Sequence, residues 1–358
     1  MKLKLLVCIV VSLFCVKSFS QDQDPLDKIK KPKTQKAEDE KKLNAKGKAE
    51  LAKAKVELKN VSDAKFEIAP NEIMNQDPKE LLGVPETEPD KKLADKQNED
   101  NKKNQNAIKE KLKKDSKDPN ANIDMSLSPT PAPVGALAAT FWYPAYYTPV
   151  KNQGGCGSCW AFAACATFEH TYKKWWGIQL DLSEQDVVAC GSTCGFWGLF
   201  SEDAGSCAGG WSDKAFDFIK CKKVASESVY PYTATSGPCY ARTKFKSAYT
   251  WGQLYPGRFP TRDEVKTYIN AYGSVVSYMK AGLSTFYAYG YGVYNGYPSN
   301  STNNIDHAVT IVGWNDYANA WIIKNSWGTG WGGYGGYAYI GYNQCNLAKY
   351  VYWVYPNY

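Results

Sequence analysis

Apolar and polar positions are distributed unevenly along the 358-residue chain: a polar, charged segment over residues 22–134 is followed by a segment rich in aromatic residues over 135–358. Residues 22–134 are dominated by Lys, Asp, Glu, Asn and Gln, and Phe66 is their only aromatic residue. A segment of this composition has few apolar side chains with which to form a core. We expect residues 90–118 to form a solvated linker. Residues 41–59 have helix-forming composition. Residues 135–358 hold all 12 Trp and many Tyr and Gly, which predicts a folded domain there.

The apolar spacing inside this domain predicts helices first and strands later. Over residues 159–176 the apolar positions are separated by four, three, four and three residues, which is the spacing of a helix with one buried face. Gly177 is well placed to end that helix. Beyond residue 249, short runs of Tyr, Val and Ile broken by Gly are typical of antiparallel strands. This order indicates an α+β fold with two lobes and a cleft between them. The buried helix positions are Ala161, Cys165, Phe168, Tyr172 and Trp175, and shorter helices are expected at 182–185, with Ser183 as N-cap, and at 216–220.

The N-terminus has the pattern of a secretory signal over residues 1–20: two lysines, an apolar run of 12 residues and then small side chains. A membrane-spanning helix needs about 20 apolar residues, so we expect no membrane span. We expect the protein to enter the secretory pathway, for a lysosome-like vacuole or the extracellular space, where disulfides form. The net charge of +7 divides into +3 for residues 1–21, +1 for 22–134 and +3 for 135–358, which argues against a nucleic-acid partner.

Three cysteines lie within ten residues in the stretch KNQGGCGSCWAFAAC, and two of them, Cys156 and Cys159, form a C-x-x-C pair. A redox pair normally follows a buried strand, whereas turn chemistry precedes this one, so a C-x-x-C oxidoreductase is the less favoured alternative. A zinc site is disfavoured because no second C-x-x-C follows and neither His170 nor His307 stands at a ligand spacing. We expect no metal and no cofactor. His170 has charged neighbours and is expected on an exposed helix face.

Nucleophilic catalysis needs a thiol, a distant histidine and a group that orients the histidine. Cys159 starts the predicted helix, where the positive end of the helix dipole favours a thiolate. His307 stands at the mouth of an apolar run and Asn325 follows the next one, 148 and 166 residues beyond Cys159. We therefore expect His307 to act as general acid and base and Asn325 to orient its ring.

Residues 140–358 resemble the papain-like cysteine proteases in five motifs that occur in the family's order: PVKNQGGCGSCWAF, LSEQDVVAC, CAGGW, DHAVTIVGW and KNSWGTGWGGYG. The resemblance implies a papain-like two-lobed fold, with a helical left lobe, a β-barrel-like right lobe and the active-site cleft between them. We expect a monomeric endopeptidase that cleaves protein or peptide substrates through an acyl-enzyme, with a catalytic thiolate and imidazolium. Gln153 would donate to the oxyanion, and Trp327 would shield the bond between Asn325 and His307 from water.

The resemblance also implies which residues bind the substrate. Gly209 and Gly210 would form antiparallel main-chain hydrogen bonds with it. The pocket for the residue just before the scissile one contains two tyrosines, so we expect a shallow pocket with a modest aliphatic preference. No histidine lies between Cys207 and Cys239, which favours endopeptidase over carboxydipeptidase action. The pocket residues are Trp211, Tyr278 and Ile305 as walls and Tyr350 as floor.

Nine cysteines remain once the expected signal is removed, and the resemblance implies two disulfides among them. Cys165 lies on the buried stripe of the predicted helix and is expected to be a buried rather than a reactive cysteine, with its pairing left open. Cys345 lacks the partner that relatives have, and its state stays open. The implied pairs are Cys156 with Cys207 and Cys190 with Cys239; Cys194 with Cys221 is the candidate extra pair, since connectivity does not follow from sequence.

Residues 21–134 are expected to be a Lys-rich propeptide and linker before a peptidase domain over 135–358. Residues 65–83, KFEIAPNEIMNQDPKELLG, resemble the part of a papain-type propeptide that lies along the cleft. We therefore expect the segment to act as an intramolecular inhibitor and the protein to be a zymogen. The alternative from a different class is a catalytically silent relative that binds peptides in the same cleft, against which the intact set of catalytic residues argues.

Overall fold

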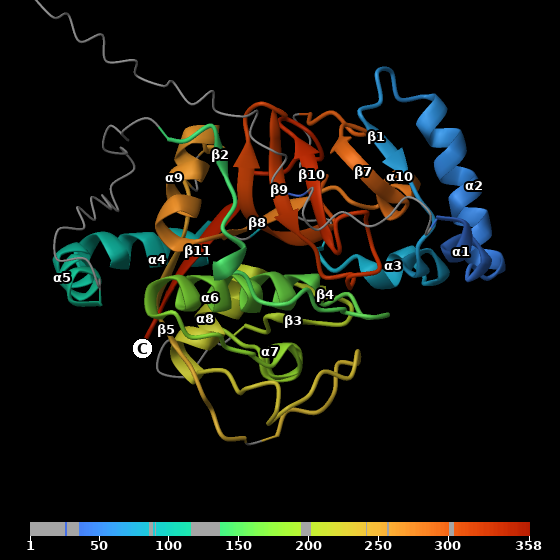
Figure 1. Ribbon diagram of the computed structural model, residues 1–358. Helices are drawn as coiled ribbons and strands as arrows, with labels where there is room; N and C mark the ends of the chain where they lie inside the picture. The colour runs from blue at the N-terminus through green and yellow to red at the C-terminus, as the bar shows by residue number, and fades with distance from the viewer. Residues whose placement is uncertain are drawn as a thin grey trace, which may run out of the picture.

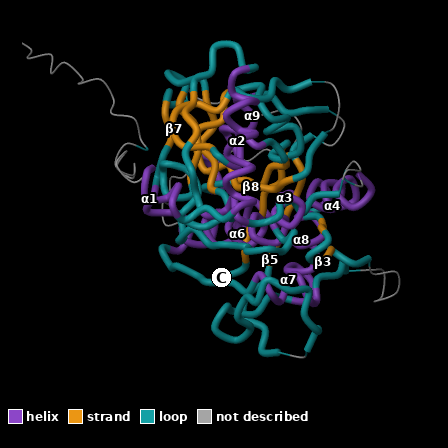
Figure 2. Tube along the Cα trace, turned by 90° about the vertical axis from the view of Figure 1, so that its right-hand side faces the viewer, coloured by secondary structure: helices purple, strands orange, loops and turns teal. Residues whose placement is uncertain are grey.

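The computed structural model describes Leu26 and residues 36–85, 89, 91–115, 137–194, 202–240, 242–255, 258–300 and 304–358. The expected signal over residues 1–20 lies outside this part of the chain. Helix α6 crosses the middle of the molecule, with β7 to β10 above it and α7 and α8 below (Figure 1). The side view in Figure 2 shows the same two layers. The α+β, two-lobed architecture predicted from the apolar spacing is confirmed.

The helical lobe is organised by α6, which has the bounds that the apolar spacing predicts. Its C-cap is Gly177, at a φ of 70°, a left-handed conformation that favours glycine. Ser183 caps the following helix, because its hydroxyl accepts from the N–H of Asp186. The elements of this lobe are α6 (Cys159–Trp176), α7 (Glu184–Cys190), β3 (Gly205–Ser206), β4 (Gly209–Gly210) and α8 (Ser212–Lys222).

The other lobe is a sheet with the strand order β1-β7-β10-β9-β8-β6-β11-β5, in which β2 also pairs with β8. The pairing of β7 with β10 is parallel and the other pairings are antiparallel. Every residue of β8 is buried, and α6 packs against it. The strands are β2 (Thr140–Phe141), β5 (Ala248–Gln253), β6 (Val275–Met279), β7 (Tyr289–Tyr294), β8 (His307–Asn315), β9 (Ala320–Lys324), β10 (Tyr337–Gly341) and β11 (Val351–Pro356), with helices α9 (Arg262–Tyr272) and α10 (Ser284–Tyr287) and a 3-10 helix at Pro144–Tyr146.

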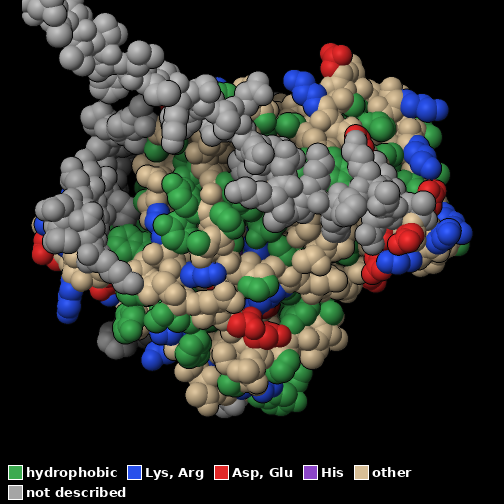
Figure 3. All heavy atoms as spheres, viewed as in Figure 1, with side chains coloured by type: hydrophobic (Ala, Val, Ile, Leu, Met, Phe, Trp, Pro, Cys, Tyr) green, Lys and Arg blue, Asp and Glu red, His purple; other side chains and the backbone are tan. Residues whose placement is uncertain are grey.

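Residues 36–85 lie against one end of the sheet, and β1 extends it by pairing with β7 (Figure 1). Helix α2 packs on α10, and a small core forms around Leu51, Met74 and Ala288. The outer face of this segment carries charges of both signs side by side (Figure 3). Its elements are α1 (Lys36–Lys41), α2 (Ala45–Lys59), β1 (Phe66–Ile68), a 3-10 helix at Glu72–Asn75 and α3 (Pro78–Leu81).

The expectation of a solvated linker over residues 90–118 is wrong for the described part, which forms α4 (Lys91–Lys103) and α5 (Gln105–Asp115). The two helices pack near β5 and α8, at the end of the sheet opposite to β1 (Figure 1). Ala94 and Leu112 are fully buried there. The prediction from composition was wrong because a few short apolar and amide side chains are enough to dock a helix when another part of the chain supplies the partner surface.

No helix among the described residues combines the length and the apolar character needed to cross a bilayer.

Candidate active site

Cys159 is the first residue of α6 and has no solvent exposure. The loop before it is fixed by the Cys156–Cys207 disulfide and by a hydrogen bond from the Gly157 N–H to the Cys207 carbonyl, 2.9 Å. A Cβ on Gly157 would lie 2.6 Å from that carbonyl oxygen, so only glycine allows this approach. The Cys159 thiol is free, and its Sγ accepts from the N–H of Ala308 at 3.4 Å.

The contact with Ala308 places Cys159 beside His307, the first residue of β8. The Nε2 of His307 lies 2.8 Å from the Oδ1 of Asn325, the residue that follows β9. An amide oxygen only accepts, and it also accepts from the Ser326 N–H at 2.8 Å, so Nε2 carries the proton. This tautomer leaves Nδ1 of His307 as the basic nitrogen. Trp327 packs on the imidazole, with ring centroids 4.7 Å apart.

Gln153 joins the same group from the loop before α6. Its side-chain Nε2 donates to the carbonyls of Cys156 and Leu81, at 2.9 and 3.1 Å. Its Oε1 accepts from the Ser326 hydroxyl at 2.6 Å, which fixes the orientation of the amide. The structure thus brings together the four residues that the sequence singles out for catalysis: Cys159, His307, Asn325 and Gln153.

The cleft over these residues is occupied by Leu81, Leu82, Gly83 and Val84 of the N-terminal segment. The N–H groups of Gly83 and Val84 both point to the carbonyl of Asp306, at 3.1 and 3.2 Å. The N–H of Gly210 donates to the Gly83 carbonyl at 3.0 Å. A Cβ on Gly83 would lie 1.9 Å from the carbonyl oxygen of Gly157, so this segment can pass only with glycine at that position.

Burial in the covered cleft changes the pKa values of both catalytic groups. Loss of solvent raises the pKa of the Cys159 thiol to about 12, despite the backbone N–H groups of Ala308 and Gly83 that favour the thiolate. Burial also lowers the pKa of His307 to about 4, against the opposing effect of Asn325. The pair is therefore a neutral thiol and a neutral imidazole while the segment is in place. The resemblance implies an ion pair instead, which needs a solvated cleft.

The residues expected to form the substrate pocket lie together beside the cleft. The rings of Trp211 and Tyr278 are 5.2 Å apart, and the Tyr278 hydroxyl accepts from the Ser212 N–H at 2.9 Å. Ile305 and Tyr350 belong to the same buried apolar cluster as these two rings. Val84 of the N-terminal segment is a further member of that cluster. Gly209 adopts a φ of 124°, which favours glycine at this position.

Three disulfides are present among the described residues, with Cys190–Cys239 and Cys194–Cys221 joining the helical lobe in addition to Cys156–Cys207. Cys165 and Cys345 are buried free thiols. The described residues contain one cluster that could supply three metal ligands, Cys194, Asp217 and Cys221. Two of these side chains are joined to each other in the disulfide, so they are not available as thiolates.

His170 is not on an exposed face, contrary to the expectation from its neighbours. It is fully buried, with Nδ1 3.0 Å from the Ser274 hydroxyl and Nε2 3.4 Å from Nζ of Lys324. Its neighbour Glu169 is also buried and accepts from the Thr148 hydroxyl at 2.7 Å. The reason is that a whole set of charged groups lies inside the interface between the lobes.

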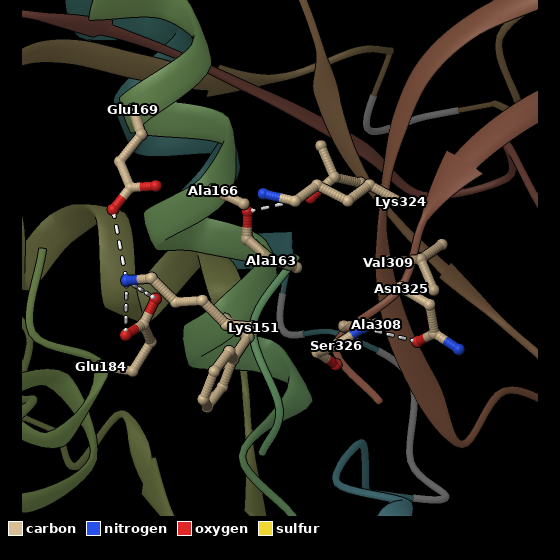
Figure 4. A pocket seen from close by; sticks show the side chains of 12 residues that line it. Lys151, Ala163, Ala166, Glu169, Glu184, Ala308, Val309, Lys324, Asn325 and Ser326 are labelled. Carbon is tan, nitrogen blue, oxygen red and sulfur yellow. Dashed lines mark hydrogen bonds and ion pairs between the residues drawn. The ribbon is translucent and has the colours of Figure 1, made fainter. Parts of the chain in front are cut away.

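This buried charge set surrounds a cavity behind the active site (Figure 4). Lys151 extends between Glu169 and Glu184, with Nζ to carboxylate distances of 3.4 and 2.9 Å. Lys324 reaches the cavity from the sheet side and donates to the Thr148 hydroxyl at 3.1 Å. Asn325 and Ser326 line the same cavity. In the sequence, the only indication of this set was that Lys151 and Lys324 lie inside the motifs PVKNQGG and KNSWGTG. A search for catalytic residues alone does not select them.

Comparison with known proteins defines the class. Residues 142–355, more than half of the chain, match the model of the papain family of cysteine proteases, and the chain belongs to this family. Fruit bromelain of Ananas comosus is 38% identical over 192 residues, which cover 52% of this chain and 50% of bromelain. Mouse (Mus musculus) cathepsin K is 36% identical over 207 residues, 56% of this chain and 58% of cathepsin K. The match thus spans between one half and three fifths of the length of these two relatives.

Solved structures agree on the fold. A structure from a study of the mite allergens Blo t 1 and Der p 1 has a TM-score of 0.62 at 27% identity and covers 91% of this chain and 99% of its own. A Carica candamarcensis cysteine protease in complex with E-64 has a TM-score of 0.52 at 29% identity, covering 62% of this chain and 100% of its own. A procathepsin L2 from Tenebrio molitor, at 24% identity and a TM-score of 0.64, covers 87% of this chain and 94% of its own and shares the fold.

Proposed function

We propose that this protein is a cysteine endopeptidase in which Cys159 is the nucleophile. The observation that carries the proposal is the contact chain from Cys159 to His307 and Asn325: the free thiol lies beside β8, and the Nε2 proton of the imidazole is held by the Asn325 amide oxygen. This leaves one basic nitrogen for the thiol proton. No cofactor or metal is needed for this chemistry.

In the proposed reaction, Nδ1 of His307 takes the proton of Cys159 and the thiolate attacks the scissile carbonyl carbon. The negative charge that develops on the carbonyl oxygen is stabilised by the Cys159 N–H and the Gln153 Nε2, which Ser326 holds in place. The tetrahedral intermediate collapses as His307 returns the proton to the leaving amine. Water then attacks the thioester, with His307 as general base, and releases the carboxylate product and the thiol.

The N-terminal segment, residues 21–134, acts in this proposal as an intramolecular inhibitor, so the protein is a zymogen. Two contacts support this role. The Leu81 carbonyl takes the Gln153 donor that the oxyanion would use, and Gly210 donates to Gly83 rather than to a substrate. The segment also keeps the catalytic pair uncharged through the burial described above. A chain that begins near Gly135 should hydrolyse peptides much faster than the full chain, and equal rates would refute inhibition.

The pocket made by Trp211, Tyr278, Ile305 and Tyr350 is proposed to select a modest aliphatic side chain. Val84 in the same apolar cluster supports this, because a β-branched aliphatic residue already packs there. A peptide library should show preference for Val or Leu at the corresponding position, and a strong preference for Arg would contradict the proposal.

We place the enzyme in the secretory pathway, as a monomer, in a lysosome-like vacuole or outside the cell. The three disulfides of the helical lobe support this compartment, because disulfides persist in oxidising environments.

The proposed activity is tested by hydrolysis of fluorogenic peptides after removal of the N-terminal segment. We expect Cys159→Ala to abolish hydrolysis and Cys165→Ala, the matched buried free thiol of α6, to retain it. Unchanged hydrolysis in Cys159→Ala would refute the proposal. Peptide binding without hydrolysis by the protein with its native Cys159 would show that it is a catalytically silent, peptide-binding member of the family. Reduction of insulin without peptide hydrolysis would show that it is a C-x-x-C oxidoreductase.

A further inference from the structure

The N-terminal segment covers both edges of the sheet and not only the cleft. At one edge, β1 pairs with β7 as an added strand. At the opposite edge, β5 has no further strand among the described residues, and α4 lies along it instead. Figure 1 shows the two coverings at opposite ends of the sheet lobe.

Helix α4 contacts β5 through amide side chains that take the place of a neighbouring strand. The Asn98 amide donates to the Gln253 carbonyl at 2.9 Å and accepts from the Gln253 N–H at 3.3 Å, as a paired strand would. The Asn101 amide donates to the Trp251 carbonyl at 2.7 Å. Residues 251 and 253 are two apart, so their backbone groups point to the same side, away from β11.

A third amide closes the contact. Gln97 is 5% exposed; its Nε2 donates to the Asn101 side chain at 2.7 Å and to the Thr250 hydroxyl at 3.1 Å. Its Oε1 accepts from Nζ of Lys220 in α8 at 2.6 Å. The spacing of residues 97, 98 and 101 puts all three amides on one face of a helix. Gln97 and Asn101 are buried, and buried amides that are paired by hydrogen bonds specify one binding geometry.

The strand is shaped for this helix. A Cβ on Gly252 would lie 2.7 Å from Oδ1 of Asn98 and 2.9 Å from the Trp353 ring, so glycine permits the close approach. Helix α5 continues the contact: Leu112 is fully buried, and the Tyr355 hydroxyl donates to Asp115 at 2.8 Å.

We propose that the edge of β5, with Thr250, Trp251 and Gln253, and the neighbouring Lys220 of α8 form a second docking site that binds the α4–α5 helices of this chain independently of the catalytic cleft. The site recognises a helix with amide side chains at positions i, i+1 and i+4. It anchors the N-terminal segment at a point distinct from residues 81–84 and shields a sheet edge that would otherwise offer unpaired backbone groups. This docking involves no catalytic step, so it stands whether or not the peptidase proposal holds.

Hydrogen–deuterium exchange of the full chain tests the site, with Cys159→Ala as the background to prevent self-cleavage. In the Asn98→Ala/Asn101→Ala variant we expect amides of α4 to exchange at least tenfold faster, while residues 81–84 keep their protection. Alanine favours a helix more than asparagine does, so faster exchange reports lost docking and not a weaker helix. Asn104→Ala is the matched control, because the Asn104 side-chain amide donates to the Asp100 carbonyl of α4 itself rather than to β5, and this variant should exchange as the unaltered chain does.

The reciprocal variant, Gly83→Ala, should lose protection in the cleft segment while α4 and α5 remain protected. The proposal is overturned if α4 exchanges in the unaltered chain as a free helix would. It is equally overturned if either variant removes protection at both places, because the two sites would then be one cooperative unit.

Discussion

Replacement of His170 by glutamine should change how stability depends on pH. His170 is buried between the Ser274 hydroxyl and the Lys324 ammonium. The ammonium can only donate, so Nε2 accepts and the ring is neutral. Burial, with Lys324 and Lys173 adding to it, holds the pKa of His170 well below its usual value. Glutamine can offer the same acceptor and donor without titrating.

The sign and size follow from proton linkage. A histidine in the unfolded chain titrates near pH ~6.5, and the folded His170 stays neutral, so its contribution is present above pH ~6.5 and is lost as the pH falls. The loss approaches about 1.4 kcal/mol per pH unit, or about 2 kcal/mol between pH ~7.5 and pH ~5. His307, whose pKa is lowered to about 4, contributes with the same sign. These are the only two histidines in the sequence, so the variant should lose half of the histidine-linked dependence.

The assay is denaturant unfolding of the full chain in the Cys159→Ala background, with and without His170→Gln, over this pH range. Burial raises the pKa values of Glu184 and Asp213 to about 8 and about 7, so the contribution of these residues to the stability of the folded protein decreases as the pH rises. This decrease is the same in both proteins. The difference between the two curves therefore isolates His170. We expect the variant to gain about 2 kcal/mol relative to its parent on acidification. Parallel curves would refute a neutral, buried His170.

Three further predictions concern the catalytic cleft. Gln153→Ala should lower kcat by about 10²–10³ with a small change in KM, measured with a fluorogenic peptide after removal of the N-terminal segment; an unchanged kcat would show that the Gln153 amide does not stabilise the oxyanion. Gly83→Ala should shorten the lag before activity appears in the full chain, because the added Cβ would lie 1.9 Å from the Gly157 carbonyl oxygen and would weaken binding of residues 81–84 in the cleft. An unaltered lag would contradict the close fit of Gly83 in the cleft. Alkylation of Cys159 by iodoacetamide at neutral pH should be slow in the full chain, where burial raises its thiol pKa to about 12, and much faster once the segment is removed; equal rates would show that the segment does not control the thiol.

Much of the fold follows from local pattern. The bounds of α6, the stop at Gly177 and the cap at Ser183 depend on the residues of those segments themselves, and the structure has them where the sequence predicts. Cys159, His307 and Asn325 could be chosen because they stand at a helix start, at a strand start and just after a strand, positions that bring side chains to a shared cleft. Gln153, in the loop before α6, was implied by the family resemblance alone.

The errors share one physical cause, which is a partner supplied from far along the chain. His170 was expected in solvent because Glu169 is beside it in the sequence. Both side chains are buried: Glu169 bonds Thr148, 21 residues away, and His170 contacts Lys324, 154 residues away. Residues 91–115 looked like linker because their amides have no local partner, while β5 provides one. Composition describes what a segment can bury alone and not what it buries against another segment.

The most direct test of the central proposal is the site and stoichiometry of labelling by an irreversible epoxide thiol inhibitor once the N-terminal segment has been removed. We expect one inhibitor per molecule, attached to Cys159 as located by peptide mass spectrometry, with peptide hydrolysis lost in step. Labelling that persists in Cys159→Ala, or hydrolysis that survives complete labelling of Cys159, would contradict it.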